Sequence, residues 1–173
     1  MDGTTYATLR PKQRDLAMLL YKLILHNVID DNGNSPLHLN AIGNRYEVIK
    51  ELIDRGANPN VRDNRQRTPL MLSSNLSVTD CLLKYKADPN LLDIYGNSAL
   101  LNALYLNDST IVESLLKAGA GPNYRLSKEK SPLIIAAKKG NKTIIELLTG
   151  YGAYFNGQEE MDRVNYFLVT TRQ

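Results

Sequence analysis

The chain has 173 residues, a formal net charge of +3 and 43% hydrophobic residues, enough apolar material for the core of one ordinary domain. Its 11 Gly, 7 Pro and 23% charged residues exclude a fibrous or disordered chain, and a single cysteine, Cys81, excludes an internal disulfide. The longest strongly apolar stretch, residues 16–25, contains Lys22 and is too short to span a bilayer. With no export signal at the N-terminus, we expect a cytoplasmic protein.

Residues 1–29 are expected to form a degenerate N-terminal capping unit. Residues 16–20 are mostly apolar with helical spacing, and polar side chains flank them. Asn27 lies one repeat period before Asn60, which closes the next unit of the chain. A terminal unit of a stacked array needs such a polar outer surface.

Two sequence markers then recur along the chain and define four units, residues 30–62, 63–92, 93–125 and 126–157. The first marker is Asn34-Ser-Pro-Leu-His38, Arg67-Thr-Pro-Leu-Met71, Asn97-Ser-Ala-Leu-Leu101 and Lys130-Ser-Pro-Leu-Ile134. The second is Gly56-Ala-Asn-Pro-Asn60, Lys86-Ala-Asp-Pro-Asn90, Gly119-Ala-Gly-Pro-Asn123 and Gly152-Ala-Tyr-Phe-Asn156. Because both markers recur at nearly constant intervals, with one shorter interval in each series, the sequence predicts repeated structural units.

Each unit is predicted to contain two antiparallel helices. Ser or Thr before the first helix is a typical N-cap, and proline suits the first helical turn; the four caps are Ser35, Thr68, Ser98 and Ser131. The second apolar run of each unit has the i, i+3, i+4 spacing of an amphipathic helix. Gly56, Gly119 and Gly152 then stand where a left-handed residue would end that helix.

The second unit departs from this pattern. It is shorter than the others between Ser73 and Val78, so its first helix is expected to be shorter by nearly a turn. Lys86 replaces the terminal glycine, which costs on the order of 1 kcal/mol if the left-handed geometry is kept. In the fourth unit Glu129 replaces the loop glycine, which predicts a distorted loop.

Residues 158–173 are expected to form a C-terminal capping helix. Met161, Val164, Phe167 and Leu168 have helical spacing. The acidic pair at 159–160 would begin this helix, where the helix dipole favours negative charge.

The two markers resemble the ankyrin repeat, whose consensus has a Thr-Pro-Leu-His tetrapeptide, a Gly-Ala-Asp-x-Asn close and a period of about 33 residues. The resemblance covers roughly the stretch from Asp30 to Asn156 and is clearest in the first unit. It implies an all-α ankyrin-repeat solenoid of stacked helix-turn-helix units, with hairpin-like loops and helical caps at both ends. It also implies a role in binding another protein, as an adaptor or inhibitor.

Few residues could carry out chemistry. The resemblance gives His38 a structural role, hydrogen bonding to the backbone to fix a loop, and Cys81 lies beside Leu82 and Leu83 in an apolar helix. His26 has no evident partner, and no metal-binding, phosphate-binding or nucleophile motif occurs. We therefore expect no enzymatic activity, no cofactor, no metal and no small-molecule substrate.

The resemblance implies that partner contacts come from the loop tips and the exposed ends of the first helices, which line a concave face. The second and fourth units contribute basic residues to this set, and the third contributes apolar and aromatic ones. Such a pattern predicts an acidic partner segment with an apolar anchor. The positions are Asp31, Asn32, Asn34, Ile42, Arg62, Asn64, Arg65, Arg67, Ile94, Tyr95, Asn97, Tyr105, Leu106, Ser127, Lys128, Lys130, Lys138 and Lys139.

Several alternatives stay open. Tyr95 and Tyr105 could pack on neighbouring loops, and the basic residues could be ordinary solvated charges. The chain could be a non-catalytic subunit or targeting module of a larger enzyme complex. A nucleic-acid binder is disfavoured because the net charge is only +3 and acids are interspersed. Stand-alone ankyrin proteins of this size are also similar to effectors that intracellular bacteria and viruses use against host proteins, which would place this chain in the host cytosol.

Overall fold

A computed structural model describes residues 29–124 and 131–170, and every regular element within these ranges is a helix. The helices are α3 (Pro36–Ile42), α4 (Tyr46–Asp54), α5 (Pro69–Leu72), α6 (Leu76–Lys84), α7 (Ala99–Leu106), α8 (Ser109–Lys117), α9 (Pro132–Lys138), α10 (Lys142–Gly150) and α11 (Gln158–Thr170). None of these helices is both long enough and apolar enough to cross a membrane. Nearly all of the expected N-terminal cap, residues 1–28, and the fourth loop with Glu129 lie outside the described residues.

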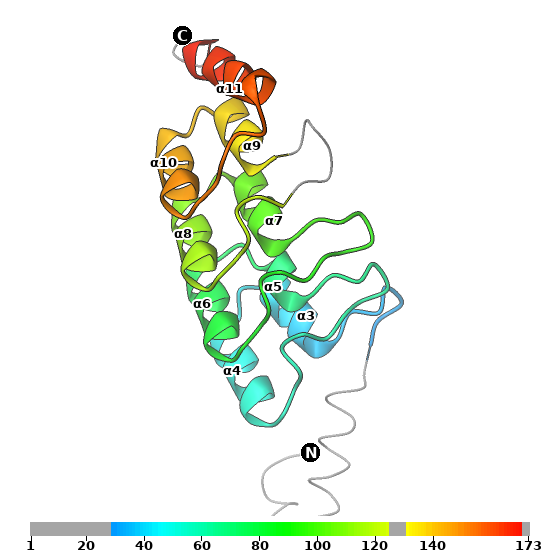
Figure 1. The fold of residues 1–173 in the computed structure, drawn as a ribbon. Helices are drawn as coiled ribbons and strands as arrows, with labels where there is room; N and C mark the ends of the chain where they lie inside the picture. Colours follow the sequence, from blue (N-terminus) through cyan, green and yellow to red (C-terminus); the bar gives the residue numbers. More distant parts are fainter. Residues whose placement is uncertain (1–28, 125–130, 171–173) are drawn as a thin grey trace, which may run out of the picture.

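The helices form two parallel columns, as Figure 1 shows. The first helix of each unit packs on the first helix of the next, in the order α3, α5, α7, α9. The second helices pack in the order α4, α6, α8, α10, and the described loops before α5 and α7 project to one side of the stack. The expected ankyrin-like solenoid is therefore confirmed.

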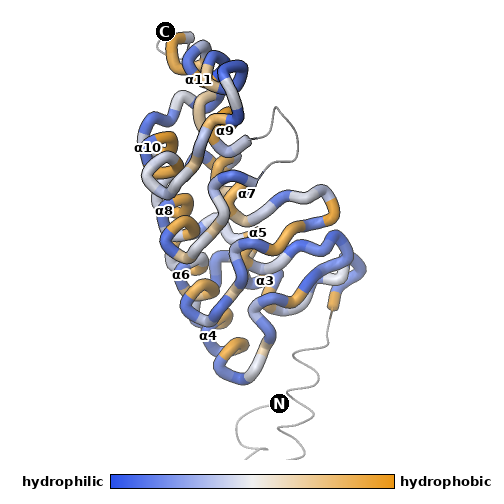
Figure 2. Tube along the Cα trace, in the orientation of Figure 1, coloured by the Kyte–Doolittle hydropathy of each residue, from blue (hydrophilic) through white to orange (hydrophobic). Residues whose placement is uncertain are grey.

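The core lies between the two columns and repeats with the units. Leucines on the first helices meet leucines on the second helices, and all of them are at most 6% exposed: Leu37, Leu70, Leu100, Leu133, Leu52, Leu82, Leu115 and Leu148. In Figure 2 the apolar colour accordingly gathers along the helices where the columns face each other. Burying apolar surface at about 25 cal/mol per Å² makes this continuous core the main stabilising contribution.

The second unit has the short first helix that its missing residues predict. Helix α5 has four residues, whereas α3, α7 and α9 have seven, eight and seven. Ser73 leaves the helix in an extended conformation, and its hydroxyl forms a 2.7 Å hydrogen bond with the Thr79 hydroxyl of α6. In the second unit this side-chain hydrogen bond thus connects the end of the first helix to the second helix, where the other units have a longer first helix.

Three of the four predicted N-caps form as expected, and the fourth does not. The hydroxyls of Ser35, Ser98 and Ser131 each accept a hydrogen bond from a backbone amide in the first turn. Thr68 makes no such bond, because the Met71 amide donates to the Thr68 backbone oxygen at 3.0 Å instead. Its hydroxyl is buried without a hydrogen-bond partner among the described residues.

The left-handed ends of the second helices are also as predicted. Gly56, Gly119 and Gly152 have φ of +97°, +88° and +87°, a region that glycine enters without a Cβ clash. Lys86 takes the same conformation, with φ of +66°. The backbone at Lys86 therefore keeps the left-handed conformation of the other units, although the Cβ atom of a lysine disfavours it.

The last helix, α11, packs against α9. Val164 is buried, and Phe167 and Leu168 are packed against the core, whereas Met161 is exposed. Glu160 lies in the first turn, as expected, but its side chain is buried rather than solvated. It accepts hydrogen bonds from the Ser131 hydroxyl and, at 2.8 Å, from the Asn156 amide, so it links α11 to the N-cap of α9.

Replacing Lys86 by glycine should stabilise the protein. The side chain of Lys86 is exposed, so the change removes little packing and relieves the left-handed strain. We expect the free energy of unfolding, measured in urea, to rise by roughly 0.5–1 kcal/mol. Gly119→Ala is the matched control and should lower it; a loss in Lys86→Gly would contradict the prediction.

Replacing Thr68 by valine tests how the buried hydroxyl of Thr68 affects the stability of the protein. Valine has nearly the same shape, and the hydroxyl it removes is buried without a partner, so the free energy of unfolding should stay constant or rise by up to about 1 kcal/mol. Ser98→Ala, which removes a formed cap, should lower it by about 1 kcal/mol. A similar loss in both variants would mean that the Thr68 hydroxyl is hydrogen-bonded in solution.

Candidate protein-binding surface

An aspartate organises each described loop of the solenoid. One carboxylate oxygen accepts hydrogen bonds from the amides two and four residues further on, at 2.8–2.9 Å, in all three loops. These aspartates are Asp30, Asp63 and Asp93. An aspartate side chain that accepts from nearby amides imposes a tight turn on the backbone. The three loops therefore share one conformation, although their tip sequences differ.

The second carboxylate oxygen of each aspartate holds the side chain four residues later. The distances are 2.9 Å to Asn34 Nδ2, 2.6 Å to Arg67 Nε and 3.0 Å to Asn97 Nδ2. The sequence predicts these three residues as partner contacts; the structure places their side chains in hydrogen bonds that hold the loops, and Asn34 is only 6% exposed. The recurring Asp-x-x-x-Asn or Arg spacing is the sequence signal that could have identified this role.

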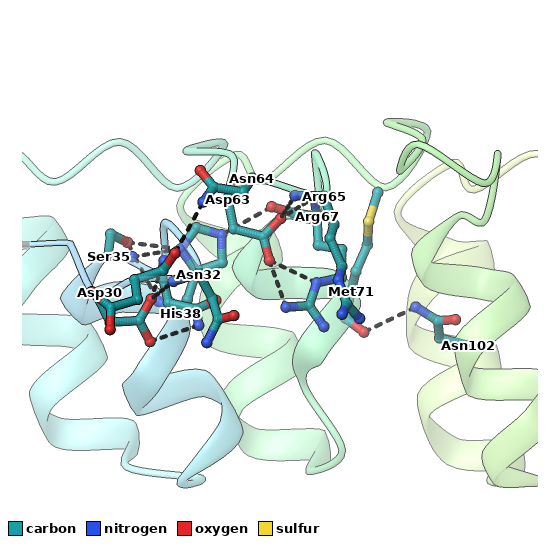
Figure 3. A network of polar contacts seen from close by, with 12 residues as sticks. Asp30, Asn32, Ser35, His38, Asp63, Asn64, Arg65, Arg67, Met71 and Asn102 are labelled. Atoms are coloured by element: carbon teal, nitrogen blue, oxygen red, sulfur yellow. Dashed lines mark hydrogen bonds and ion pairs between the residues drawn. The ribbon is translucent and has the colours of Figure 1, made fainter.

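These loops are joined to one another by backbone hydrogen bonds. The Asn64 amide donates to the Asn32 oxygen at 3.1 Å, and the Ile94 amide donates to the Arg65 oxygen at 3.0 Å. Figure 3 shows how closely the first two loops approach. At Gly33, which has φ of +78°, a Cβ atom would lie 2.8 Å from the Asn64 backbone nitrogen, so only glycine fits. The loop tips thus form a continuous, rigid edge.

His38 joins the first unit to the second. It is fully buried, and its Nδ1 accepts from the Ser35 amide at 3.1 Å. Its Nε2 lies 2.9 Å from the Arg67 backbone oxygen, which can only accept, so Nε2 carries the proton and the ring is neutral. Burial lowers the pKa of His38 below its usual value. The expected structural role of this histidine is confirmed, and Figure 3 shows it between Ser35 and Arg67.

Cys81 is also structural. Its side chain is buried in α6, and this burial raises the pKa of the thiol, so the nucleophilic thiolate is disfavoured. Among the residues that the structure describes, no group of three His, Cys, Asp or Glu side chains is placed to hold a metal ion.

The apolar members of the predicted surface are exposed. In the third unit Ile94 and Tyr95 lie at the loop tip, and Tyr105 and Leu106 end α7. Their exposed fractions are 54%, 62%, 46% and 53%, so the two tyrosines do not bury themselves against neighbouring loops. We call these four residues the apolar anchor. Ile42, at the equivalent end of α3, is 50% exposed.

The remaining charged and polar members of the predicted surface divide into three groups. Arg65 and Lys139 are exposed, as are Asp31, Asn32 and Asn64. Arg62 donates to Gln66 and to the Leu92 oxygen, and the Lys138 ammonium lies 5.5 Å from the Phe167 ring centre. Ser127, Lys128 and Lys130 lie outside the described residues.

The buried neutral state of His38 predicts acid destabilisation. The unfolded state takes up a proton near pH 6.5 and the folded state only at lower pH, so stability is full above pH 6.5 and falls as the pH drops below it. We expect the free energy of unfolding to decrease between pH 7.5 and 5.5 in the wild type and to change less in His38→Gln. Equal slopes in the two proteins, measured by urea titration at each pH, would contradict this.

Comparison with known proteins places this geometry in a family. A family model of ankyrin repeats in three copies matches residues 6–93 and 73–159. The chain is 37% identical over 94 residues to the human transient receptor potential cation channel subfamily A member 1, covering 52% of this chain and 8% of that protein. It is 37% identical over 108 residues to the chicken nuclear factor NF-kappa-B p105 subunit, covering 57% of this chain and 11% of that protein.

A viral protein is similar over a shorter stretch. The variola virus ankyrin repeat protein OPG189 is 39% identical over 54 residues, covering 29% of this chain and 10% of that protein. The chain thus spans only about a tenth of the length of each of these three relatives. The stacked helix pairs, the aspartate-closed loops and the family match over most of the sequence lead to one identification: the chain belongs to the ankyrin-repeat family.

Proposed function

We propose that this chain is a non-catalytic module that binds a partner protein through the concave side of its solenoid, as an adaptor or inhibitor. Ankyrin repeats are in general protein–protein interaction modules. The observation that carries the proposal is the apolar anchor, four exposed side chains on one unit, two at a loop tip that is hydrogen-bonded to the neighbouring loop and two at the end of α7. Large apolar side chains held on a rigid edge bind at little entropic cost.

The partner segment that fits this surface is apolar with acidic flanks. A tyrosine at the centre of an interface contributes about 2 kcal/mol or more, whereas an exposed ion pair contributes about 0–1 kcal/mol, so the anchor should dominate affinity. Arg65 and Lys139 on the neighbouring units would steer acidic groups. Arg67 contributes little, because its charge is compensated by Asp63 at 2.6 Å.

The proposal of a non-catalytic role rests on the two most reactive side chains described, His38 and Cys81. His38 uses both ring nitrogens in hydrogen bonds to its own loop and to the next unit. Cys81 is buried, with a raised thiol pKa. Both features support a non-catalytic role.

We also propose that the protein acts in the cytoplasm, and in the host cytosol if it is a pathogen effector. The similarity to a variola virus ankyrin repeat protein supports the effector role. A second candidate is a targeting module of a larger assembly. That candidate is supported by the small share, 8% and 11%, that the matched region takes of two of the relatives.

The double variant Tyr95→Ala, Tyr105→Ala tests the binding surface. We expect it to weaken binding of a captured partner by about 2–4 kcal/mol, or roughly 30- to 1000-fold in Kd, because it removes both aromatic anchors. Partners would be captured from a eukaryotic lysate with the wild type, and Kd would then be measured by calorimetry.

The matched control is Tyr154→Ala with Tyr166→Ala, which removes two tyrosines of equal or greater exposure, 62% and 65%, outside the anchor. Its Kd should stay close to that of the wild type. Unchanged affinity in the anchor variant, with circular dichroism showing an intact fold, would refute the proposed surface.

A further inference from the structure

The chain contains two Asn-Gly dipeptides, Asn32-Gly33 and Asn156-Gly157, and they lie in different environments. An asparagine followed by glycine can lose its side-chain amide spontaneously, because glycine has no Cβ atom to keep its backbone nitrogen away from the asparagine Cγ. Whether this reaction occurs in the folded protein depends on whether the fold leaves both groups free.

The first dipeptide, Asn32-Gly33, is held by its loop. The Gly33 amide donates to the Asp30 oxygen at 2.8 Å, and the Asn32 oxygen accepts from the Asn64 amide at 3.1 Å. Gly33 is buried, and Asn64 fills the space beside it. Ring closure at Asn32 would break these hydrogen bonds, so the fold protects this dipeptide.

The second dipeptide, Asn156-Gly157, has no such protection. It lies between α10 and α11, and both residues are exposed (Figure 1). Within the described ranges, neither the Asn156 side chain nor the Gly157 amide has a hydrogen-bond partner. Apart from the chain neighbours of Gly157, no atom lies within 4 Å of the place where its Cβ would stand. Both reacting groups are therefore free and open to water.

The asparagines at the equivalent positions of the earlier units are engaged. The side-chain amides of Asn60, Asn90 and Asn123 each donate to a backbone oxygen of the next unit, at 2.9–3.2 Å. The residue that follows each of them also has a Cβ atom. Asn156 alone among the four combines a free side chain with a following glycine.

We propose that Asn156 is a site of spontaneous deamidation, and that the reaction loosens α11 from the solenoid. The Gly157 backbone nitrogen forms a bond to Asn156 Cγ while the Cγ–Nδ2 bond breaks, and Nδ2 leaves as ammonia with the Gly157 amide proton. Water then opens the cyclic imide to aspartate or isoaspartate. The product carries a negative charge that asparagine lacks, and isoaspartate also lengthens the backbone by a methylene group.

The new carboxylate arises next to a buried one. The Asn156 amide donates to Glu160 Oε2 at 2.8 Å, and the Glu160 side chain, which is buried, also accepts from the Ser131 hydroxyl. Like charges repel more strongly where water is excluded. Deamidation therefore disfavours the contact that links α11 to the N-cap of α9, and with it the packing of Val164.

Peptide mapping by mass spectrometry, on the full chain incubated at neutral pH, tests the site. Residue 156 should convert to aspartate and isoaspartate while Asn32 stays amidated. In concentrated urea both dipeptides should react at similar rates, because the fold no longer distinguishes them. An Asn156 that stays intact in the folded protein, or an Asn32 that reacts there equally fast, would overturn the proposal.

The variant Asn156→Asp, with Asn156→Gln as its uncharged control, tests the effect on α11. Asn156→Asp should lower Tm and speed the hydrogen exchange of the Val164 amide, followed by NMR. The exchange of the Leu82 amide in α6 should stay as in the wild type. Equal Tm and equal Val164 exchange in the two variants would show that the new charge leaves α11 in place, which contradicts the proposed loosening.

Discussion

Each unit of this protein depends on its neighbours, because the helices within the described repeats are all short, the longest having nine residues. Isolated helices of that length are marginal in water, and a single pair cannot enclose its own apolar faces. Stacking supplies the missing cover, since a leucine such as Leu82 or Leu115 is buried only between its own unit and the units beside it. The hydrogen bonds between units then fix the register of this stacking.

Two sets of polar contacts between units recur along the stack. In the first set, the side-chain amide of the asparagine that ends a unit pairs with a backbone carbonyl and a backbone amide of the next unit, as Asn90 does with Gly119 and Gly121. In the second set, the described loops, each closed by its own aspartate, share backbone hydrogen bonds. Because these backbone amides and carbonyls are hydrogen-bonded within the protein, the scaffold does not need the exposed side chains of the apolar anchor for its stability.

Much of this fold could be predicted from the sequence, because repetition turns a weak local signal into a strong one. The left-handed conformation of Lys86 is an example: lysine alone would not predict it, and the glycines at the equivalent positions do. The role of His38 followed from its motif in the same way. The short α5 followed from the shorter interval between markers in the second unit.

The sequence is least informative where a side chain's role depends on a partner distant from its motif. Asn34, Arg67 and Asn97 have the polarity of loop-tip contact residues, and only the aspartate four residues earlier shows that their side chains also hold the loops. Thr68 matches a cap by sequence, but its short helix directs the Met71 amide to a backbone oxygen. In the third unit, the side chains of Tyr95 and Tyr105 make no such contact with another described residue, and both are exposed.

The second unit combines several weaknesses, and its position next to the apolar anchor makes them relevant to binding. A short first helix, an unpaired Thr68 hydroxyl and a left-handed Lys86 all fall within one stretch of this unit, from Thr68 to Lys86. In a stack with nearest-neighbour coupling, opening costs least where the local unit is weakest. A partner that contacted both Arg65 of this unit and Tyr105 of the next would bridge the two units, so its binding would oppose their separation. On the proposed surface, affinity would therefore be coupled to the stability of the second unit, even though the anchor itself lies on the third.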